Sequence, residues 1–176
     1  MMAVIKSLQT IEATTSKPIS RKLWLYDTFE GMSAPTDTDI DFLGNDAQQL
    51  LNQQQPEDPQ SVWCLSGLDD VRKNVGSTGY SDQQIEFVAG KVEETLPSRI
   101  PEQIALLRLD TDWYESTMHE LIHLFPRLVV GGVIIIDDYG HWQGCRRAVD
   151  EYFANNNVQL LLNRIDYTAR IGVKIS

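Results

Sequence analysis

The sequence predicts a single α/β domain, in which a doubly wound, mostly parallel sheet is covered by helices and ends in an antiparallel hairpin. Three observations predict this. Short apolar runs alternate with segments of helical periodicity along the 176 residues. Two apolar runs, 104–109 and 133–136, end abruptly in carboxylates, as buried parallel strands do when their ends reach a ligand crevice. The last two strand candidates are joined by a short link, which favours an antiparallel pair.

The first half of the chain contains one long polar segment between its predicted elements. Residues 30–60 are rich in Pro, Asp and Gln, and a loop of this length inside one domain is typical of a lid over a binding site. Ser66 is predicted as the N-cap of a helix, because two acidic residues follow in the first turn. Helices are expected at 3–15, briefly within 46–52, and from 66 to about 76; strands are expected at 21–26 and 85–89.

The second half of the chain follows the same alternation. Gly131 and Gly132 are expected to separate a helix from the second acid-tipped strand. A short turn is predicted at 93–97, helices at 113–125 and 144–155, and strands at 104–109, 133–136, 159–163 and 169–175.

Composition narrows the class of protein. The formal net charge is −10, with 25 acidic and 15 basic residues, and such a charge repels the phosphates of nucleic acids. No run approaches the ~20 apolar residues of a membrane span, and residues 1–6 do not resemble a secretory signal. The two cysteines, Cys64 and Cys145, have no metal-like spacing and are interpreted as reduced, semi-buried residues. We therefore expect a cytoplasmic domain that binds neither nucleic acid nor membrane.

The acids that follow the two apolar runs predict a metal site. Asp110 follows the first run, and Asp137 and Asp138 follow the second. If the strands are neighbours, these carboxylates converge at one sheet edge, where repulsion and desolvation oppose their approach. A divalent cation compensates for that cost, and oxygen ligands suit Mg²⁺. The sequence thus predicts Mg²⁺ at Asp110, Asp137 and Asp138.

Several further residues have two readings each. Asp27 ends a strand, where an acid can accept hydrogen bonds from a ribose, but Asp is also common in turns. Asp112 would face the same way as Asp110 in an extended segment and can act as a base, or it can cap the following helix. His119 and His123 have a zinc-pair spacing but no matching motif, so a solvent-facing position is favoured. His141 and Trp142 follow the second acidic cluster and are candidates for the lining of a substrate pocket.

Five segments resemble the macrocin O-methyltransferase (TylF-like) family. They are WLYDTFEGM at 24–32, VAGKVEETLP at 88–97, LRLDTDWYEST at 107–117, FPRL at 125–128 and GGVIIIDDYG at 131–140. Members of the family use S-adenosylmethionine and Mg²⁺ to methylate sugar hydroxyls of antibiotics and related small molecules. The resemblance implies a Rossmann-like class I methyltransferase fold and a soluble small-molecule hydroxyl acceptor.

The resemblance also implies roles for particular residues. Asp110, Asp137 and Asp138 would bind the metal, and Asp112 would be the general base. The cofactor would contact Asp27, Thr28, Phe29, Gly90, Lys91 and Asp110.

One expected element is missing from the sequence. No strand with a Gly-containing loop precedes the helix at 3–15, although the family has one there, between the strands 21–26 and 104–109. We therefore expect an N-terminally incomplete sheet with a gap, which a second copy of the chain could fill by exchange of elements. A truncated, non-catalytic methyltransferase-like protein that keeps the metal site is the alternative function. A Mg²⁺-dependent phosphate-ester hydrolase is a weaker one, because no further motif supports it.

Overall fold

The strands of the protein form two sheets. The computed structural model describes residues 1–15, 21–56, 58 and 61–175. In the smaller sheet, β1 (Leu23–Asp27) pairs in parallel with β2 (Ile85–Ala89). No ladder in the described residues joins β1 to β3 (Ile104–Leu109), the two strands between which the sequence predicts a gap.

The larger sheet has the order β3-β4-β6-β5. β3 pairs in parallel with β4 (Leu128–Ile136), and β6 (Arg170–Val173) then runs antiparallel to both β4 and β5 (Asn163–Arg164). The parallel strands and the final antiparallel hairpin confirm the predicted fold class.

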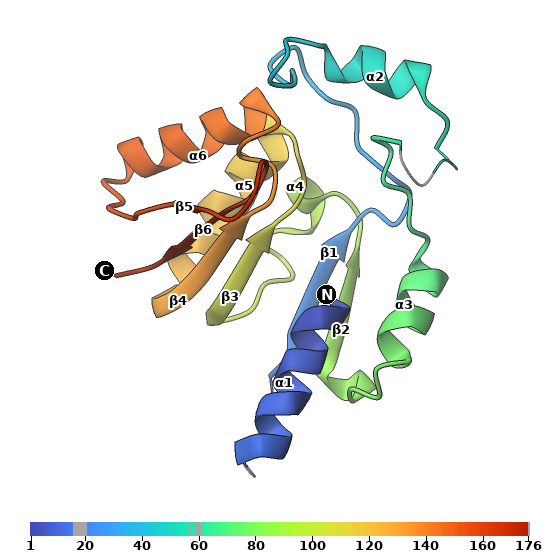
Figure 1. The fold of residues 1–176 in the computed structure, drawn as a ribbon, viewed down its shortest axis with the longest axis vertical. Coiled ribbons are helices and arrows are strands. Elements are labelled where there is room, and N and C mark those ends of the chain that lie inside the picture. Colours follow the sequence, from blue (N-terminus) through green and yellow to red (C-terminus); the bar gives the residue numbers. More distant parts are fainter. Residues whose placement is uncertain (16–20, 57, 59–60, 176) are drawn as a thin grey trace.

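Helices cover the two sheets separately (Figure 1). α1 and α3 lie beside the β1–β2 pair, and α5 and α6 pack against each other and against the larger sheet. No helix in the described part of the chain has the length and apolar character needed to cross a membrane. The helical bounds are α1 Met2–Thr15, α2 Ala47–Gln53, α3 Leu68–Gly76, α4 Val92–Thr95, α5 Tyr114–Leu124 and α6 Gln143–Asn155, with 3₁₀ turns η1 at Asp82–Gln84 and η2 at Phe125–Arg127.

Each sheet has its own apolar core. The smaller core is built on Ile5, Leu23 and Val75, from α1, β1 and α3. In the larger core, alternate residues of β3 and β4 are buried, among them Leu107 and its register partner Ile134. The other face of β3 is open, as the 42% exposure of Leu106 shows. The apolar run at 104–109 is therefore buried on one face, whereas the sequence predicts burial on both.

Four predicted boundaries are wrong. β4 begins at Leu128 and not after the two glycines. Gly131, with φ +82°, lies within the strand, and the pairing with β3 shifts register nearby. The glycines therefore mark an irregularity in the strand and not its start. β5 pairs only at Asn163 and Arg164, so the strand predicted at 159–163 lies almost wholly outside it. The N-cap of α3 is Gly67 and not Ser66. The N-cap of α5 is Trp113, which the sequence predicts as the first residue of the helix.

Part of the polar segment 30–60 is firmly anchored. The Asp39 side chain is fully buried and accepts hydrogen bonds from the Thr36 amide and the Tyr114 amide, both 2.7 Å long. The amide of Gln143 donates to the Ile40 carbonyl at 2.9 Å. These contacts fix the segment on the N-terminal ends of α5 and α6, beside the acids that follow β3 and β4.

Candidate functional site

A tight turn follows β3 and carries its acidic residues. The Trp113 amide donates to the Thr111 carbonyl at 2.7 Å, which leaves Asp112 in the left-handed region with φ +65°. A non-glycine residue in this region carries a conformational cost that the surrounding contacts must offset. The sequence predicts an extended segment at 110–112, and this prediction is wrong. The turn, and not strand alternation, directs Asp112 toward the end of β4.

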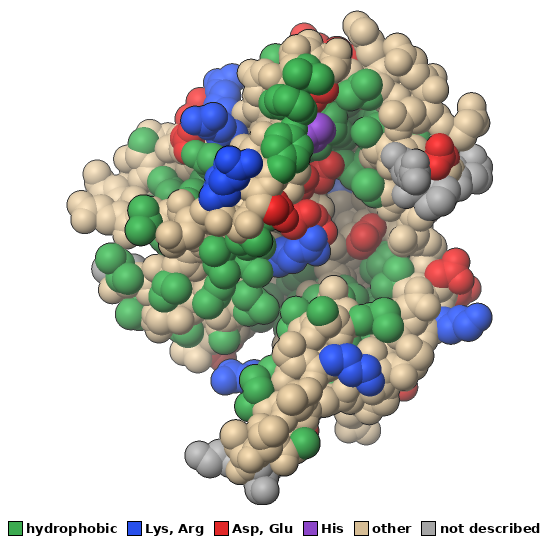
Figure 2. Space-filling view, viewed as in Figure 1, with side chains coloured by type: hydrophobic (Ala, Val, Ile, Leu, Met, Phe, Trp, Pro, Cys, Tyr) green, Lys and Arg blue, Asp and Glu red, His purple; other side chains and the backbone are tan. Residues whose placement is uncertain are grey.

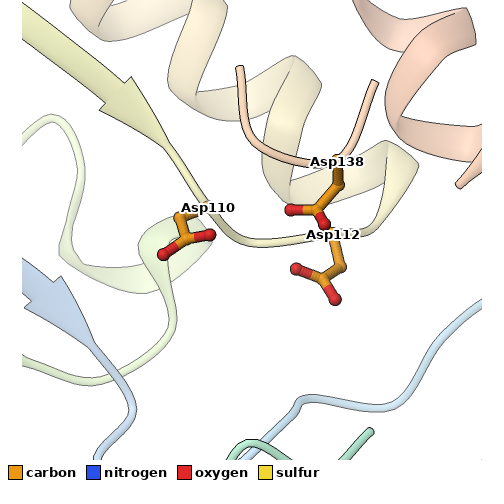
Figure 3. A group of neighbouring side chains, drawn as sticks. All are labelled: Asp110, Asp112 and Asp138. Atoms are coloured by element: carbon orange, nitrogen blue, oxygen red, sulfur yellow. The ribbon is translucent and has the colours of Figure 1, made fainter. Parts of the chain in front are cut away.

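Three carboxylates converge just beyond the ends of β3 and β4. One oxygen from each of Asp110, Asp112 and Asp138 lies within 4.8 Å of the other two. Figure 3 shows Asp112 and Asp138 close together, with Asp110 to one side at the end of its strand. Oδ2 of Asp138 is buried and has no hydrogen-bond partner among the described residues. A buried, unpartnered carboxylate oxygen requires a proton or a cation for compensation, so these residues fit a hard divalent ion.

The electrostatic cost of the cluster appears in its pKa values. Burial, reinforced by the charge of Asp112, raises the pKa of Asp138 to about 9. Burial likewise raises the pKa of Asp112, although a hydrogen bond from Trp142 opposes the rise. Burial also raises the pKa of Asp110, against the nearby charge of Arg108. Because each shift opposes ionisation, all three groups cannot be charged together without a counter-charge.

Arg108 supplies part of that counter-charge. Its guanidinium lies 2.7 Å from Asp110 Oδ2 and 3.0 Å from Asp137 Oδ1. Asp137, a predicted metal ligand, is therefore held by an ion pair, while Asp112, the predicted base, lies in the three-carboxylate cluster in its place. Arg108 is a site residue that was not predicted from the sequence, although its position two residues before Asp110 in a strand indicates the same face.

The alternative role of Asp112 as a helix cap is excluded. The first amide of α5, at Tyr114, is instead capped by Oδ1 of Asp39 from the polar segment. Oδ2 of Asp112 accepts a hydrogen bond of 3.0 Å from the indole Nε1 of Trp142. The ring of Trp142 packs edge-on against Trp113, with 4.9 Å between centroids, so the donor is itself held in place.

The side chain of Glu120 stabilises the turn that carries Asp112. This side chain on α5 is buried, and burial raises its pKa to about 8. Its Oε2 accepts a hydrogen bond of 2.9 Å from the Thr111 hydroxyl, while the Ser116 hydroxyl donates to the Thr111 carbonyl at 3.0 Å. Glu120 was not predicted from the sequence either, although its spacing from Ser116 and Leu124 places it on the buried side of the helix.

A pocket of about 300 Å³ connects the two sheets. The ends of β1 and β2 contribute Asp27 and Gly90, and the turn after β3 contributes Asp112. Figure 2 shows this hollow with acidic side chains gathered along it. The lining residues are Tyr26, Asp27, Thr28, Gly31, Met32, Ser33, Cys64, Ser66, Gly90, Lys91, Val92, Glu93, Asp110, Thr111, Asp112 and Ser116.

The pocket brings together most of the residues predicted to contact a cofactor. Phe29 is the exception, since it is 8% exposed, packs against Phe87 and is not among the lining residues. Oδ1 of Asp27 accepts the Phe29 amide at 2.7 Å, so Asp27 does form a turn, and it also faces the pocket. The turn reading of Asp27 is therefore confirmed, and its contact with a ribose stays a prediction.

The histidine pair lies outside this site. The rings of His119 and His123 are 4.5 Å apart, and Nε2 of His119 is 3.3 Å from the Leu96 carbonyl oxygen. Within the described ranges the acids at the ends of β3 and β4 form the one group of three potential metal ligands, so no third ligand joins the histidines. Both cysteines are free, but Cys64 is exposed and Cys145 is buried, so the expectation of two semi-buried residues is wrong.

Comparison with known proteins gives consistent matches. The family described as Macrocin-O-methyltransferase (TylF) matches residues 4–171. The chain is 35% identical over 146 residues to the demethyldecarbamoylnovobiocin O-methyltransferase of Streptomyces niveus, covering 83% of this chain and 52% of that protein. It is 36% identical over 146 residues to the mycinamicin III 3''-O-methyltransferase of Micromonospora griseorubida, covering 83% of this chain and 54% of that protein.

Solved structures agree with the fold. The O-methyltransferase NovP superposes with a TM-score of 0.73 at 30% identity, over 98% of this chain and 66% of that one. The calicheamicin methyltransferase CalS11 superposes with a TM-score of 0.65 at 19% identity, over 97% and 66% of the two chains. The chain spans about half the length of the curated relatives it matches.

Proposed function

The chain belongs to the macrocin O-methyltransferase (TylF) family, and from this premise we propose that it transfers a methyl group from S-adenosylmethionine to a hydroxyl of a sugar-like or other natural-product small molecule. The observation that carries the proposal is a pocket that joins the ends of β1 and β2 to the acids after β3. Ligands of open α/β sheets bind at such strand ends.

The half of the pocket formed by the smaller sheet is proposed to hold the cofactor. Asp27 has a carboxylate at the end of β1 that can accept hydrogen bonds from both ribose hydroxyls. Gly90, with φ +125°, follows β2 and brings its backbone to the pocket without a side chain, and Lys91 lies beside it. These residues would contact the adenosine part.

The acidic half is proposed to hold Mg²⁺. Asp110 and Asp138 offer converging oxygens, and the unpartnered Oδ2 of Asp138 favours this assignment. Asp137, which the sequence also predicts as a ligand, would first have to leave Arg108. The ion, when bound, would lower the pKa of a coordinated acceptor hydroxyl.

Asp112 is proposed as the general base. The indole of Trp142 holds one of its oxygens, and the carboxylate faces the pocket, where it can take the proton of the acceptor hydroxyl. S-adenosylmethionine, when bound, would supply the methyl group: the O–CH₃ bond would form as the S–CH₃ bond breaks and S-adenosylhomocysteine leaves. The fixed positions of both reactants would provide much of the rate.

Calorimetry with S-adenosylhomocysteine, with and without Mg²⁺, tests the proposal. We expect binding of the product, and Mg²⁺ binding that Asp138→Asn weakens at least about tenfold. Asp112→Asn should keep Mg²⁺ binding and abolish methyl transfer. Loss of Mg²⁺ affinity in Asp112→Asn would make Asp112 a ligand instead, and failure of the wild type to bind the product would overturn the proposal.

The alternative of a non-catalytic binding protein has one observation in its favour. The sheet is split between β1 and β3, immediately beside the pocket. A wild-type chain that binds Mg²⁺ in the calorimeter but does not bind S-adenosylhomocysteine would favour this alternative.

A further inference from the structure

A cluster of aromatic rings lies next to the acids but outside the pocket lining. We define the aromatic cluster as Phe42, His141 and Tyr167, which come from three segments far apart in the sequence. The ring centroids of Phe42 and Tyr167 are 5.1 Å apart, and those of Phe42 and His141 are 5.7 Å apart. Phe42 is 51% exposed and Tyr167 is 44% exposed. Single exposed aromatic residues are common, but here three aromatic rings converge at one place on the surface.

The backbone holds these rings in position. Asp41 accepts two hydrogen bonds of 2.8 Å from amides of the turn that carries Phe42. The Gly140 amide donates to the Thr168 carbonyl at 2.8 Å, and a Cβ at Gly140 would collide with the carbonyl oxygen of Tyr167. Gly140 therefore allows the β5–β6 hairpin to approach the loop that carries His141. Backbone hydrogen bonds and the close approach at Gly140 thus fix the segments that carry the three rings.

His141 gives the cluster a polar group. Its Nδ1 lies 2.9 Å from the Tyr167 hydroxyl. Nε2 has no hydrogen bond within the part of the chain that the structure describes, so it can pair with a ligand hydroxyl.

Trp142 connects the aromatic cluster to Asp112, which lines the pocket. The rings of His141 and Trp142 are 4.7 Å apart, and Trp142 in turn donates to Asp112. The amides of His141 and Trp142 both donate to the Asp138 carbonyl at 3.0 Å. On the other side, Asp112 shares the pocket lining with Asp27. Hydrophobic and His side chains accordingly border the row of acidic side chains in Figure 2.

We infer that the aromatic cluster is the acceptor subsite and binds a sugar-like ring through its C–H face, which places a ring hydroxyl toward Asp112. This inference rests on the proposed function. A pyranose ring has an apolar C–H face that packs on aromatic rings, and hydroxyl groups at its edge that suit His141 Nε2. An anionic occupant is disfavoured by the neighbouring acids and the net charge of −10.

Saturation-transfer NMR with methyl α-L-rhamnoside and 4-nitrophenyl α-L-rhamnoside tests the subsite without requiring turnover. We expect saturation of the sugar C–H protons by the wild-type chain. Phe42→Ala and Tyr167→Ala should each weaken binding about 5- to 10-fold. Tyr167→Phe keeps the ring and should retain most of the signal. Leu161→Ala removes an apolar side chain that is 77% exposed and lies outside the cluster, so it serves as the matched control.

Three outcomes would overturn the subsite: no sugar signal in the wild type, an equal loss in Leu161→Ala, or saturation confined to the nitrophenyl protons. The calorimetry with S-adenosylhomocysteine is an independent measurement. A sugar signal that depends on Phe42, in a chain that does not bind S-adenosylhomocysteine, would keep the subsite and overturn the proposed methyl transfer.

Discussion

Asp39 should contribute more to stability than any exposed helix cap, because its carboxylate is fully buried between the polar segment and α5. It accepts the amides of Thr36 and Tyr114 at 2.7 Å and the Thr36 hydroxyl at 2.9 Å. Each hydrogen bond to a charged acceptor contributes about 1.5–3 kcal/mol. Asp39→Ala removes all three, and partial access of water offsets some of the loss. We therefore expect the free energy of unfolding to fall by about 3–5 kcal/mol.

Asp46 offers a matched control. Its Oδ1 accepts one amide, that of Gln49, at 2.8 Å, at the exposed start of α2. Asp46→Ala should cost about 1 kcal/mol. Asp39→Asn should fall between the two alanine variants, because an amide oxygen can still accept the Tyr114 amide while its NH₂ group cannot accept the Thr36 amide.

Urea unfolding followed by circular dichroism measures all three variants. The midpoint should decrease in the order Asp46→Ala, Asp39→Asn, Asp39→Ala, with an unchanged denaturant slope. Hydrogen exchange should also speed up locally at the Tyr114 amide. The reasoning would be refuted by an Asp39→Ala variant that loses no more stability than Asp46→Ala.

Three further predictions concern the site. Trp142→Phe keeps an aromatic ring but removes the donor to Asp112, so methyl transfer should slow about 10- to 100-fold, while Trp24→Phe should leave it unchanged. Equal rates in the two variants would remove Trp142 from the site. Burial raises the pKa of Glu120 from 4.5 to about 8, so the unfolded state loses this proton at a lower pH than the folded state does. The free energy of unfolding should therefore fall as the pH rises across that interval. Glu120→Gln should flatten this pH dependence, measured by urea unfolding at each pH. Cys64 is exposed and lines the pocket, so S-adenosylhomocysteine should slow its alkylation by iodoacetamide. Cys145 is buried, and burial raises the pKa of its thiol, so it should resist alkylation with or without the ligand. An unchanged rate of Cys64 alkylation at saturating ligand would place the ligand elsewhere.

The meeting of acids at the strand ends could be predicted from the sequence. Strands that run in parallel end at the same edge, so Asp110 and Asp138 had to approach if β3 and β4 were neighbours. The fold class followed from the same alternation of apolar runs and helical segments, and it is confirmed.

Other parts of the site depend on contacts that local patterns do not encode. The capping of α5 by Asp39 joins residues 75 positions apart, so no spacing rule could assign it. The ion pair of Arg108 with Asp137 depends on which face of β3 is open, and an apolar run alone does not reveal that face. The left-handed conformation of Asp112 arises from the turn around Thr111, where propensity predicts an extended segment or a cap.

The presence of two separate cores has a consequence for cooperativity. Among the described residues, no strand ladder joins the β1–β2 unit to the larger sheet, so each can open without first breaking a ladder of the other. The pocket, however, takes Asp27 and Gly90 from one unit and Asp112 from the other. A ligand bound there couples two foldons into one, adding about 2.7 kcal/mol at a hundred times its dissociation constant. Occupancy would thus determine whether the domain unfolds in one step or in two.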